Sequence, residues 1–204
     1  MNVTARENDM FRTMLSAGAL LLTLSAPAWA ADRGAQDTVA QTAPSSDANL
    51  QLFKAVQKQV LRYTHFTIFD SVHIALNDGD VELTGKVTMP YKRADLEDRV
   101  AKVSGVRSVK NKIAVLPVSQ FDDELRFRIA RAIYSNANFW GYGSMVNPPI
   151  HVIGEHGRVT LEGVVNNNTD RMIARSIASS FTSIGPVTNA LKTEAEAKEE
   201  LERL

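Results

Sequence analysis

One internal repeat limits the folds that are open to this chain. Shifting the sequence by 78 residues superposes residues 72–113 on residues 150–191 without a gap, and nine of these 42 positions are identical. The identical pairs are His73/His151, Gly79/Gly157, Val81/Val159, Leu83/Leu161, Gly85/Gly163, Val87/Val165, Arg93/Arg171, Val109/Val187 and Asn111/Asn189. The sequence therefore predicts two copies of one small module.

Each copy begins its repeat with the pattern of a β-hairpin. Apolar and polar residues alternate on both sides of a turn that contains Gly79 in the first copy and Gly157 in the second. Apolar residues at spacings of three and four then predict a helix, with Leu96, Val100, Val103 and Val106 in the first copy and Ala174, Ala178, Phe181 and Ile184 in the second. A strand is expected next, over residues 109–116 and 187–192.

An amphipathic helix is also expected before each hairpin. It carries Leu52, Val56 and Val60 in the first copy and Leu125, Ile129 and Ile133 in the second, where Asp122 and Asp123 are expected to cap and begin it. The predicted fold class is α+β, with two tandem α-β-β-α-β modules, each a three-stranded mixed sheet with two helices on one face. Because modules of this size have small cores, we expect the two copies to touch.

The N-terminus has the pattern of a secretory signal. Arg12 precedes an uncharged apolar run over residues 14–27, which ends in the small-x-small site Ala28-Trp29-Ala30. We expect cleavage after Ala30 and a periplasmic mature protein. The acidic residues before Met10 are unusual in a signal, whereas a chain that starts at Met10 would have an ordinary one.

The domain organisation follows from these patterns. We expect a signal peptide (1–30), a disordered linker (31–48), a first module (49–118), a second module (121–192) and a charged helical tail (193–204). No segment of the expected mature chain is apolar enough to span a bilayer. The 23 basic and 23 acidic residues balance, which is unlike a nucleic-acid-binding protein, and the absence of cysteine excludes disulfides and thiolate metal sites.

The repeated motifs resemble the BON domain, a family named for osmotically inducible periplasmic and nodulation proteins. The first copy has a hairpin motif at residues 78–87 and a Gly-Val-x-x-Val-x-Asn motif at residues 105–111, and the resemblance covers nearly all of residues 50–191. The second copy keeps the hairpin motif but replaces the later one by residues 183–189, so the turn there is expected to differ. This resemblance implies a non-catalytic binding or scaffolding module without a cofactor, associated with phospholipid or envelope contact and osmotic stress.

The residues do not support a catalytic triad or a metal site. Asp70, Ser71 and His73 invite comparison with a catalytic triad, but Ser71 and His73 would lie about 6.5 to 7 Å apart on one strand, beyond hydrogen-bond reach. The shared histidines are interpreted as polar residues on the open face of each sheet. A metal site would have to bring His73, His151 and His156 together from distant strands, so no metal is expected.

Two surfaces are candidates for contact with a membrane or partner. A loop that is five residues longer in the second copy carries Phe139, Trp140, Tyr142 and Met145, which either fold back between the two modules or remain exposed. The other candidate is a basic surface of the first copy that includes Lys92, Arg93, Arg99 and Lys102, which is either an ordinary solvated face or a site for anionic headgroups.

Two functional hypotheses follow from the sequence. In the first, the protein is a non-catalytic, periplasmic, envelope-associated protein that binds anionic phospholipid headgroups or an envelope protein. In the second, it is a soluble stress-protective or chaperone-like protein that binds protein clients.

Overall fold

The structure is a computed structural model that describes residues 46–181 and 186–202. The predicted signal peptide, most of the predicted linker, and Ile184 lie outside the described residues. Where described, the chain forms two successive α+β modules, as the repeat predicts.

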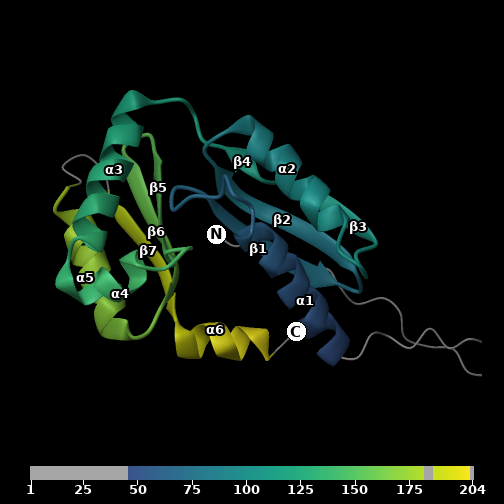
Figure 1. Ribbon diagram of the computed structural model, residues 1–204. Coiled ribbons are helices and arrows are strands. Elements are labelled where there is room, and N and C mark those ends of the chain that lie inside the picture. Colours follow the sequence, from purple (N-terminus) through teal and green to yellow (C-terminus); the bar gives the residue numbers. More distant parts are fainter. Residues whose placement is uncertain (1–45, 182–185, 203–204) are drawn as a thin grey trace, which may run out of the picture. The chain divides into compact units, whose positions relative to one another are not determined.

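The first module is a mixed sheet covered by two helices. Its elements are α1 (Ser46–Leu61), β1 (Ser71–Asn77), β2 (Asp80–Val87), α2 (Pro90–Ala101), β3 (Ser108–Asn111) and β4 (Ala114–Val115). β2 pairs antiparallel with β1 and parallel with both β3 and β4, so the predicted last strand is present in two pieces. α1 and α2 lie side by side against this sheet (Figure 1).

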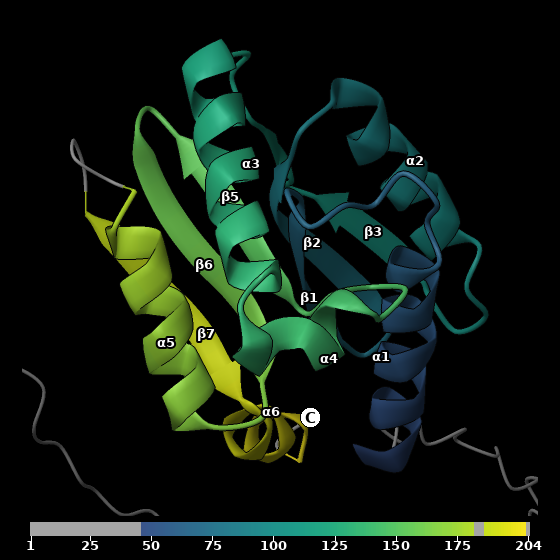
Figure 2. The same ribbon diagram turned by 60° about the vertical axis from the view of Figure 1, so that its left-hand side comes forward.

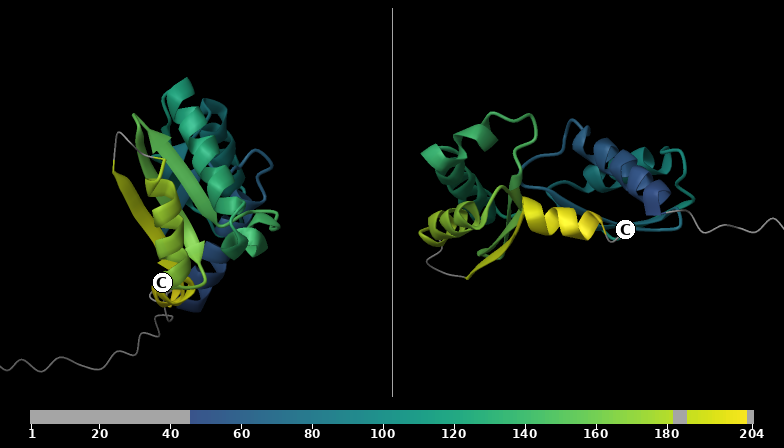
Figure 3. Two further views of the ribbon diagram at one scale, coloured as in Figure 1. Left: turned by 90° about the vertical axis from the view of Figure 1, so that its left-hand side faces the viewer. Right: turned by 90° about the horizontal axis from the view of Figure 1, so that it is seen from below.

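The second module repeats this architecture. Its elements are α3 (Gln120–Tyr134), η1 (Ala137–Phe139), α4 (Trp140–Gly143), β5 (Ile150–Glu155), β6 (Arg158–Val165), α5 (Asn168–Ser179), β7 (Val187–Thr193) and α6 (Glu194–Leu201). β6 pairs antiparallel with β5 and parallel with β7. α3 and α5 cover one face of the sheet (Figure 2), and α6 continues from the end of β7 (Figure 3).

The shared glycines Gly85 and Gly163 permit a close approach between paired strands. Both have positive φ, at 115° and 119°. A Cβ atom on Gly85 would lie 2.2 Å from the carbonyl oxygen of Ser71, and one on Gly163 would lie 1.8 Å from that of Pro149. Only glycine fits these positions, which explains their place in the repeat.

The shared asparagines tie the last strand of each module to the preceding helix. The side-chain amide of Asn111 donates to the carbonyl of Arg93 at 2.8 Å, and Asn189 donates to that of Arg171 at 2.9 Å. Each asparagine also accepts from the backbone N–H two residues later. In both copies, one side chain thus joins two backbone segments that local structure leaves unconnected.

The cores lie between helices and sheets, as the apolar spacing predicts. Val56, Leu83 and Leu96 are fully buried in the first module, and Ile129 and Leu161 in the second. The start of α3 corrects one detail of the prediction. Ser119, rather than an aspartate, is its N-cap, because the Ser119 hydroxyl accepts from the backbone N–H of Asp122.

Asp122 instead anchors the second hairpin. Its carboxylate accepts from the backbone N–H groups of His156, at 2.9 Å, and Gly157, at 2.7 Å. Burial alone would raise the pKa of Asp122, but these hydrogen bonds and Ser119 hold it below its usual range. The carboxylate therefore fixes the hairpin against the start of α3.

The two modules touch, as expected, through the connection between α1 and β1. Ile68 and Phe69 of this connection pack on the core of the second module. The Phe69 ring meets that of Phe127 on α3 edge to face, with 4.7 Å between centroids. The backbone N–H of Val152 on β5 donates to the carbonyl of Ile68 at 2.8 Å. A segment of the first module therefore helps to build the second core.

Polar side chains also cross this junction. Ser71 and His73 on β1 both bind the Glu162 carboxylate on β6, with 2.8 Å between His73 Nε2 and the nearer oxygen. Lys86 on β2 pairs with Glu155 on β5. The junction therefore combines an apolar contact with several titratable groups.

Candidate functional site

The aromatic loop of the second module is anchored by two buried rings. Phe139 is fully buried and Tyr142 nearly so, and both belong to the core of the second module. The Tyr142 hydroxyl donates to Asp170 and accepts from the backbone N–H of Asn166, each at 2.8 Å. Burial raises the pKa of Tyr142. The prediction that Phe139 and Tyr142 contact a membrane or partner is therefore wrong, because both rings lie in the core of their own module.

The remainder of the loop is exposed. Trp140 is 75% exposed, Met145 50% and Val146 97%. Gly141 faces open space, since a Cβ atom there would meet nothing within 4 Å. These apolar side chains are not packed between the modules, and they protrude from a loop that its buried rings hold in place.

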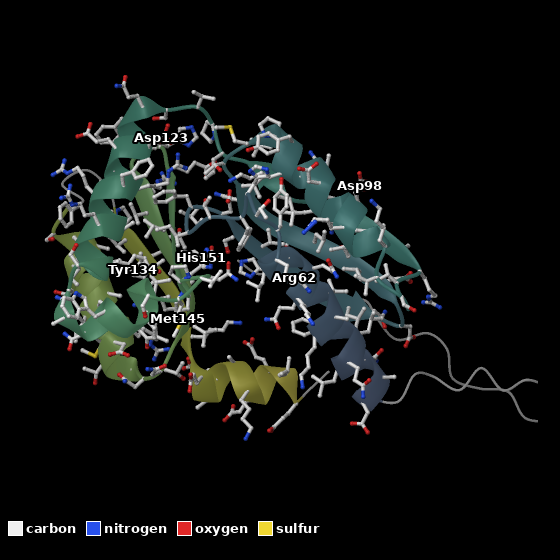
Figure 4. The ribbon with its side chains drawn as sticks, viewed as in Figure 1. Arg62, Asp98, Asp123, Tyr134, Met145 and His151 are labelled. Atoms are coloured by element: carbon white, nitrogen blue, oxygen red, sulfur yellow. The ribbon has the colours of Figure 1, made fainter. Side chains whose placement is uncertain are left out.

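Two hydrogen bonds place this loop and a basic residue at the same helix end. The Asn147 side-chain amide donates to the carbonyl of Leu61 at 3.1 Å, and Arg99 on α2 donates to that of Arg62 at 3.1 Å. These carbonyls belong to the C-terminal end of α1, whose helix offers them no N–H partner. Figure 4 labels Met145 in the loop and Arg62 at this helix end.

We call the exposed side chains of this loop and of the end of α1 the contact patch. It comprises Leu61, Arg62, Trp140, Met145 and Val146. Leu61 is 38% exposed and the Arg62 side chain is exposed. The guanidinium of Arg99, which donates to the carbonyl of Arg62, lies 5.3 Å from the centre of the Tyr63 ring. The Asn147–Leu61 hydrogen bond therefore brings the end of the apolar loop to the exposed residues at the end of α1.

Several basic side chains of the predicted basic surface pair with carboxylates of the first module. Lys92 is a wrong prediction as a surface contact, because it is buried and its ammonium group lies 2.7 Å from the Asp70 carboxylate. Arg93 is exposed and approaches the carbonyl of Asn111 at 3.5 Å, and Lys102 is also exposed. The neighbouring Arg107, Lys110 and Lys112 pair with Asp80 and Glu82.

Asp70 is the centre of a buried polar cluster. Its carboxylate accepts from Lys92 and from the backbone N–H and hydroxyl groups of Thr67 and Thr88, all within 2.9 Å. Burial alone would raise the pKa of Asp70, but these donors outweigh it and hold the pKa below its usual range. Asp70 therefore fixes the α1–β1 connection against the start of α2.

The structure does not assemble a triad around Ser71. Ser71 and His73 reach the same oxygen of Glu162 from one side, and no hydrogen bond joins the hydroxyl to the imidazole. A histidine that activates a serine must accept its proton directly. The arrangement therefore works as a contact between modules, and Asp70 takes no part in it.

The shared histidines have different environments. His73 is exposed, and its Nε2 atom lies 2.8 Å from the Glu162 carboxylate of the second module. His151 corrects the prediction, because it is partly buried against the Phe66 ring, 5.5 Å away between centroids. Among the residues that the structure describes, no three His, Asp or Glu side chains come close enough to hold a metal ion.

Four residues of the contact patch and the junction were not predicted from the sequence: Leu61, Arg62, Asn147 and Glu162. Leu61 and Arg62 end an ordinary amphipathic helix, and nothing in the sequence brings Asn147 to them across 86 positions. Glu162 occupies a position where the first copy has Thr84, so the repeat offered no signal for its role. The exposure of Val146 could have been predicted, since this residue follows Met145 in the lengthened loop.

The chain is therefore built from two tandem α+β modules, each a mixed sheet covered by two helices. The BON domain profile matches residues 51–117 and 122–195, and the chain therefore belongs to the BON-domain family as a tandem member. BON domains are generally non-catalytic binding domains, associated with membrane or envelope binding and with stress, and such proteins are commonly periplasmic. Within the described ranges, no helix combines the length and apolarity needed to cross a membrane.

Solved structures give a more distant likeness. A structure of CdsD, a structural protein of the type III secretion system of Chlamydia trachomatis, is 15% identical, and the match covers 76% of this chain and 99% of that one with a TM-score of 0.27. The C-terminal domain of CdsD is 14% identical, with coverage of 70% and 96% and a TM-score of 0.24. No curated protein matches the sequence.

Proposed function

We propose that the mature chain is a non-catalytic periplasmic protein that binds the cell envelope through the contact patch, with anionic phospholipid headgroups or an envelope protein as its partner. The observation that carries this proposal is the Asn147–Leu61 hydrogen bond, which joins the exposed apolar loop to the basic end of α1. An envelope or osmotic stress response is the setting that family membership favours.

The chemistry of the contact patch suits a membrane interface. Tryptophan favours the boundary between headgroups and acyl chains, and Met145 and Val146 add apolar area beside it. Arg62 and the exposed Lys58, in the last turn of α1, supply positive charge on the same helix end. Each well-placed basic residue near an anionic surface contributes about 1 kcal/mol at low salt.

A fluorescence experiment tests this site directly. The sequence has two tryptophans, Trp29 and Trp140, so the chain from Ala31 onward has Trp140 as its sole indole. The mature chain is titrated with phosphatidylglycerol vesicles and with phosphatidylcholine vesicles at low and high salt. We expect a blue shift of Trp140 emission and co-sedimentation with the anionic vesicles, both weakened by salt.

Matched variants separate the patch from the rest of the surface. Trp140→Ser and Arg62→Gln should each weaken sedimentation with anionic vesicles several-fold, whereas Met172→Ser, at a 64% exposed residue on α5, should not. No sedimentation and no emission shift with any vesicle would contradict the lipid proposal. Suppression of client aggregation without vesicle binding would support the chaperone-like hypothesis instead.

A further inference from the structure

His151 lies where the two modules meet. It is on β5, next to Val152, whose backbone N–H donates across the junction to Ile68. Its ring packs against Phe66 of the first module. Its Nδ1 atom is shielded from solvent and makes no hydrogen bond within the described residues, although the backbone of Thr67 and Asp70 lies near the ring. Figure 4 labels His151. The environment of this imidazole is thus supplied by both modules.

The charged groups around His151 are already committed to other partners. Glu162, opposite His151 in the strand pair, binds Ser71 and His73 of β1. Asp70 of the connection is saturated by Lys92 and by two threonines. Both carboxylates therefore favour a proton on His151 only through their charge, because their oxygens already bind other partners.

The remaining charges at the junction lie on β2, β5, β7 and α3, where Arg126 interacts with Asp70. Lys192 of β7 acts on His73 and disfavours its protonated form. Lys86 of β2 and Glu155 of β5 pair with each other. None of these groups offers a free anion to a protonated His151, whereas the neutral ring fits its apolar contact with Phe66.

We propose that the junction between the two modules is an acid-sensitive switch, in which protonation of His151 releases the second module from the α1–β1 connection. The switch uses the geometry of the junction: one shielded imidazole, one apolar contact and carboxylates that are already paired. Opening requires breaking the Val152–Ile68 hydrogen bond and withdrawing Ile68 and Phe69 from the second core.

The two histidines at the junction respond to pH in opposite directions. Burial lowers the pKa of His151, against weaker opposing effects of the backbone of Asp70 and Thr67 and of the Asp70 and Glu162 charges. Its contribution to docking is therefore complete above pH 6.5 and is lost as pH falls through the lowered pKa. The hydrogen bond from Glu162 raises the pKa of His73, so its contribution is complete below pH 6.5 and is lost as pH rises.

On acidification, the effect of His151 on docking outweighs that of His73. The His73 side chain is 60% exposed, so solvent screens its pairing with Glu162. The hydrogen bond from His73 lowers the pKa of Glu162, which keeps that carboxylate charged well below pH 6.5. On acidification from pH 7.5, the protonation of His151 is thus the change that opposes docking.

Opening also has a consequence for binding, which rests on the proposed function. The contact patch takes Leu61 and Arg62 from one module and Trp140 from the other. Separating the modules breaks the Asn147–Leu61 bond and divides the patch. Acid release would then weaken vesicle binding together with docking.

The absence of native cysteine allows docking to be measured by single-molecule energy transfer. Lys102→Cys and Arg175→Cys place dyes at one exposed residue in each module. Between pH 7.5 and 5.0, we expect a single efficiency population to split into two, with a midpoint below 6.5. His151→Phe should retain the single population to pH 5.0, whereas His65→Gln, at an exposed histidine, should behave like the parent.

Two outcomes overturn the switch. One is a parent distribution that does not change with pH, and the other is a His151→Phe variant that opens at the same pH as the parent. If His151→Phe fails to fold, an NMR titration of the unsubstituted chain decides, since the proposal requires His151 to titrate below 6.5 in step with the distance change. Vesicle binding is recorded separately, so an acid-dependent distance change without binding contradicts only the proposed function.

Discussion

The backbone N–H of Val152 donates to the carbonyl oxygen of Ile68 at 2.8 Å, which joins the edge strand of the second sheet to a connection of the first module. Ile68 and Phe69 pack on the second core at the same place. The two modules therefore share part of one core, and we expect them to unfold together as a cooperative unit.

Phe69→Ala tests this sharing. The substitution removes a partly buried ring that contacts Phe127, and it should lower the free energy of unfolding by about 2–3 kcal/mol. Urea unfolding followed by far-ultraviolet circular dichroism should show one transition at a lower midpoint. Met172→Ala, at a 64% exposed residue, is the control and should change stability by less than about 0.5 kcal/mol. Two separate transitions in the parent chain would contradict a shared core.

The buried Asp70–Lys92 pair should be costly to break. Asp70→Ala leaves the Lys92 ammonium group buried without its partner and should cost about 3–5 kcal/mol. Asp70→Asn combined with Lys92→Met removes both charges and should recover much of this loss. Equal stability of Asp70→Ala and the parent would refute the account.

The same pair predicts a pH dependence. Because the donors around Asp70 hold its pKa below the ordinary value of 3.8, its contribution to stability is complete above that pH. It is lost as pH falls through the lowered pKa. The free energy of unfolding of the parent should therefore fall more steeply below pH 4 than that of the double variant, measured by urea titrations at each pH.

Three glycine-to-alanine substitutions should have different effects. Gly85→Ala and Gly163→Ala each force a Cβ atom against a carbonyl oxygen at positive φ and should destabilise the fold by about 3 kcal/mol or more. Gly141→Ala places its methyl group in open space within α4 and should be neutral or slightly stabilising. Thermal unfolding of the three variants gives this comparison, and similar melting temperatures would disprove it.

The aromatic loop should separate into structural and exposed positions. Tyr142→Phe removes a hydroxyl that serves Asp170 and Asn166 and should cost about 1–2 kcal/mol. Trp140→Ala should change the free energy of unfolding by less than about 0.5 kcal/mol, because Trp140 is 75% exposed. A large destabilisation by Trp140→Ala, measured in urea, would show that this ring is packed in solution.

Much of the fold could be predicted because its signals are local. Alternating residues around Gly79 and Gly157 predict the two hairpins, and apolar spacing predicts the helices that cover them. The errors are also local in origin. The strand after Val109 is interrupted where the Asn111 side chain accepts the N–H of Ile113, and the cap of α3 is Ser119.

The candidate site was harder to predict because exposure depends on distant partners. Phe139, Trp140 and Tyr142 are neighbours of similar chemistry, yet only Trp140 is outside the core. Lys92 lies in a basic stretch, but its ammonium group is buried by a carboxylate 22 positions earlier. Composition alone distinguishes none of these cases.

The sequence by itself determined the two modules, their order of elements and their family, because glycine geometry and the alternation of apolar residues act over a few positions. The tertiary structure alone decided which aromatic residues face solvent, that Glu162 and His151 meet the first module, and that Asn147 caps the end of α1. These contacts join segments far apart along the chain, and each depends on how the folded modules pack, which no local pattern of residues encodes.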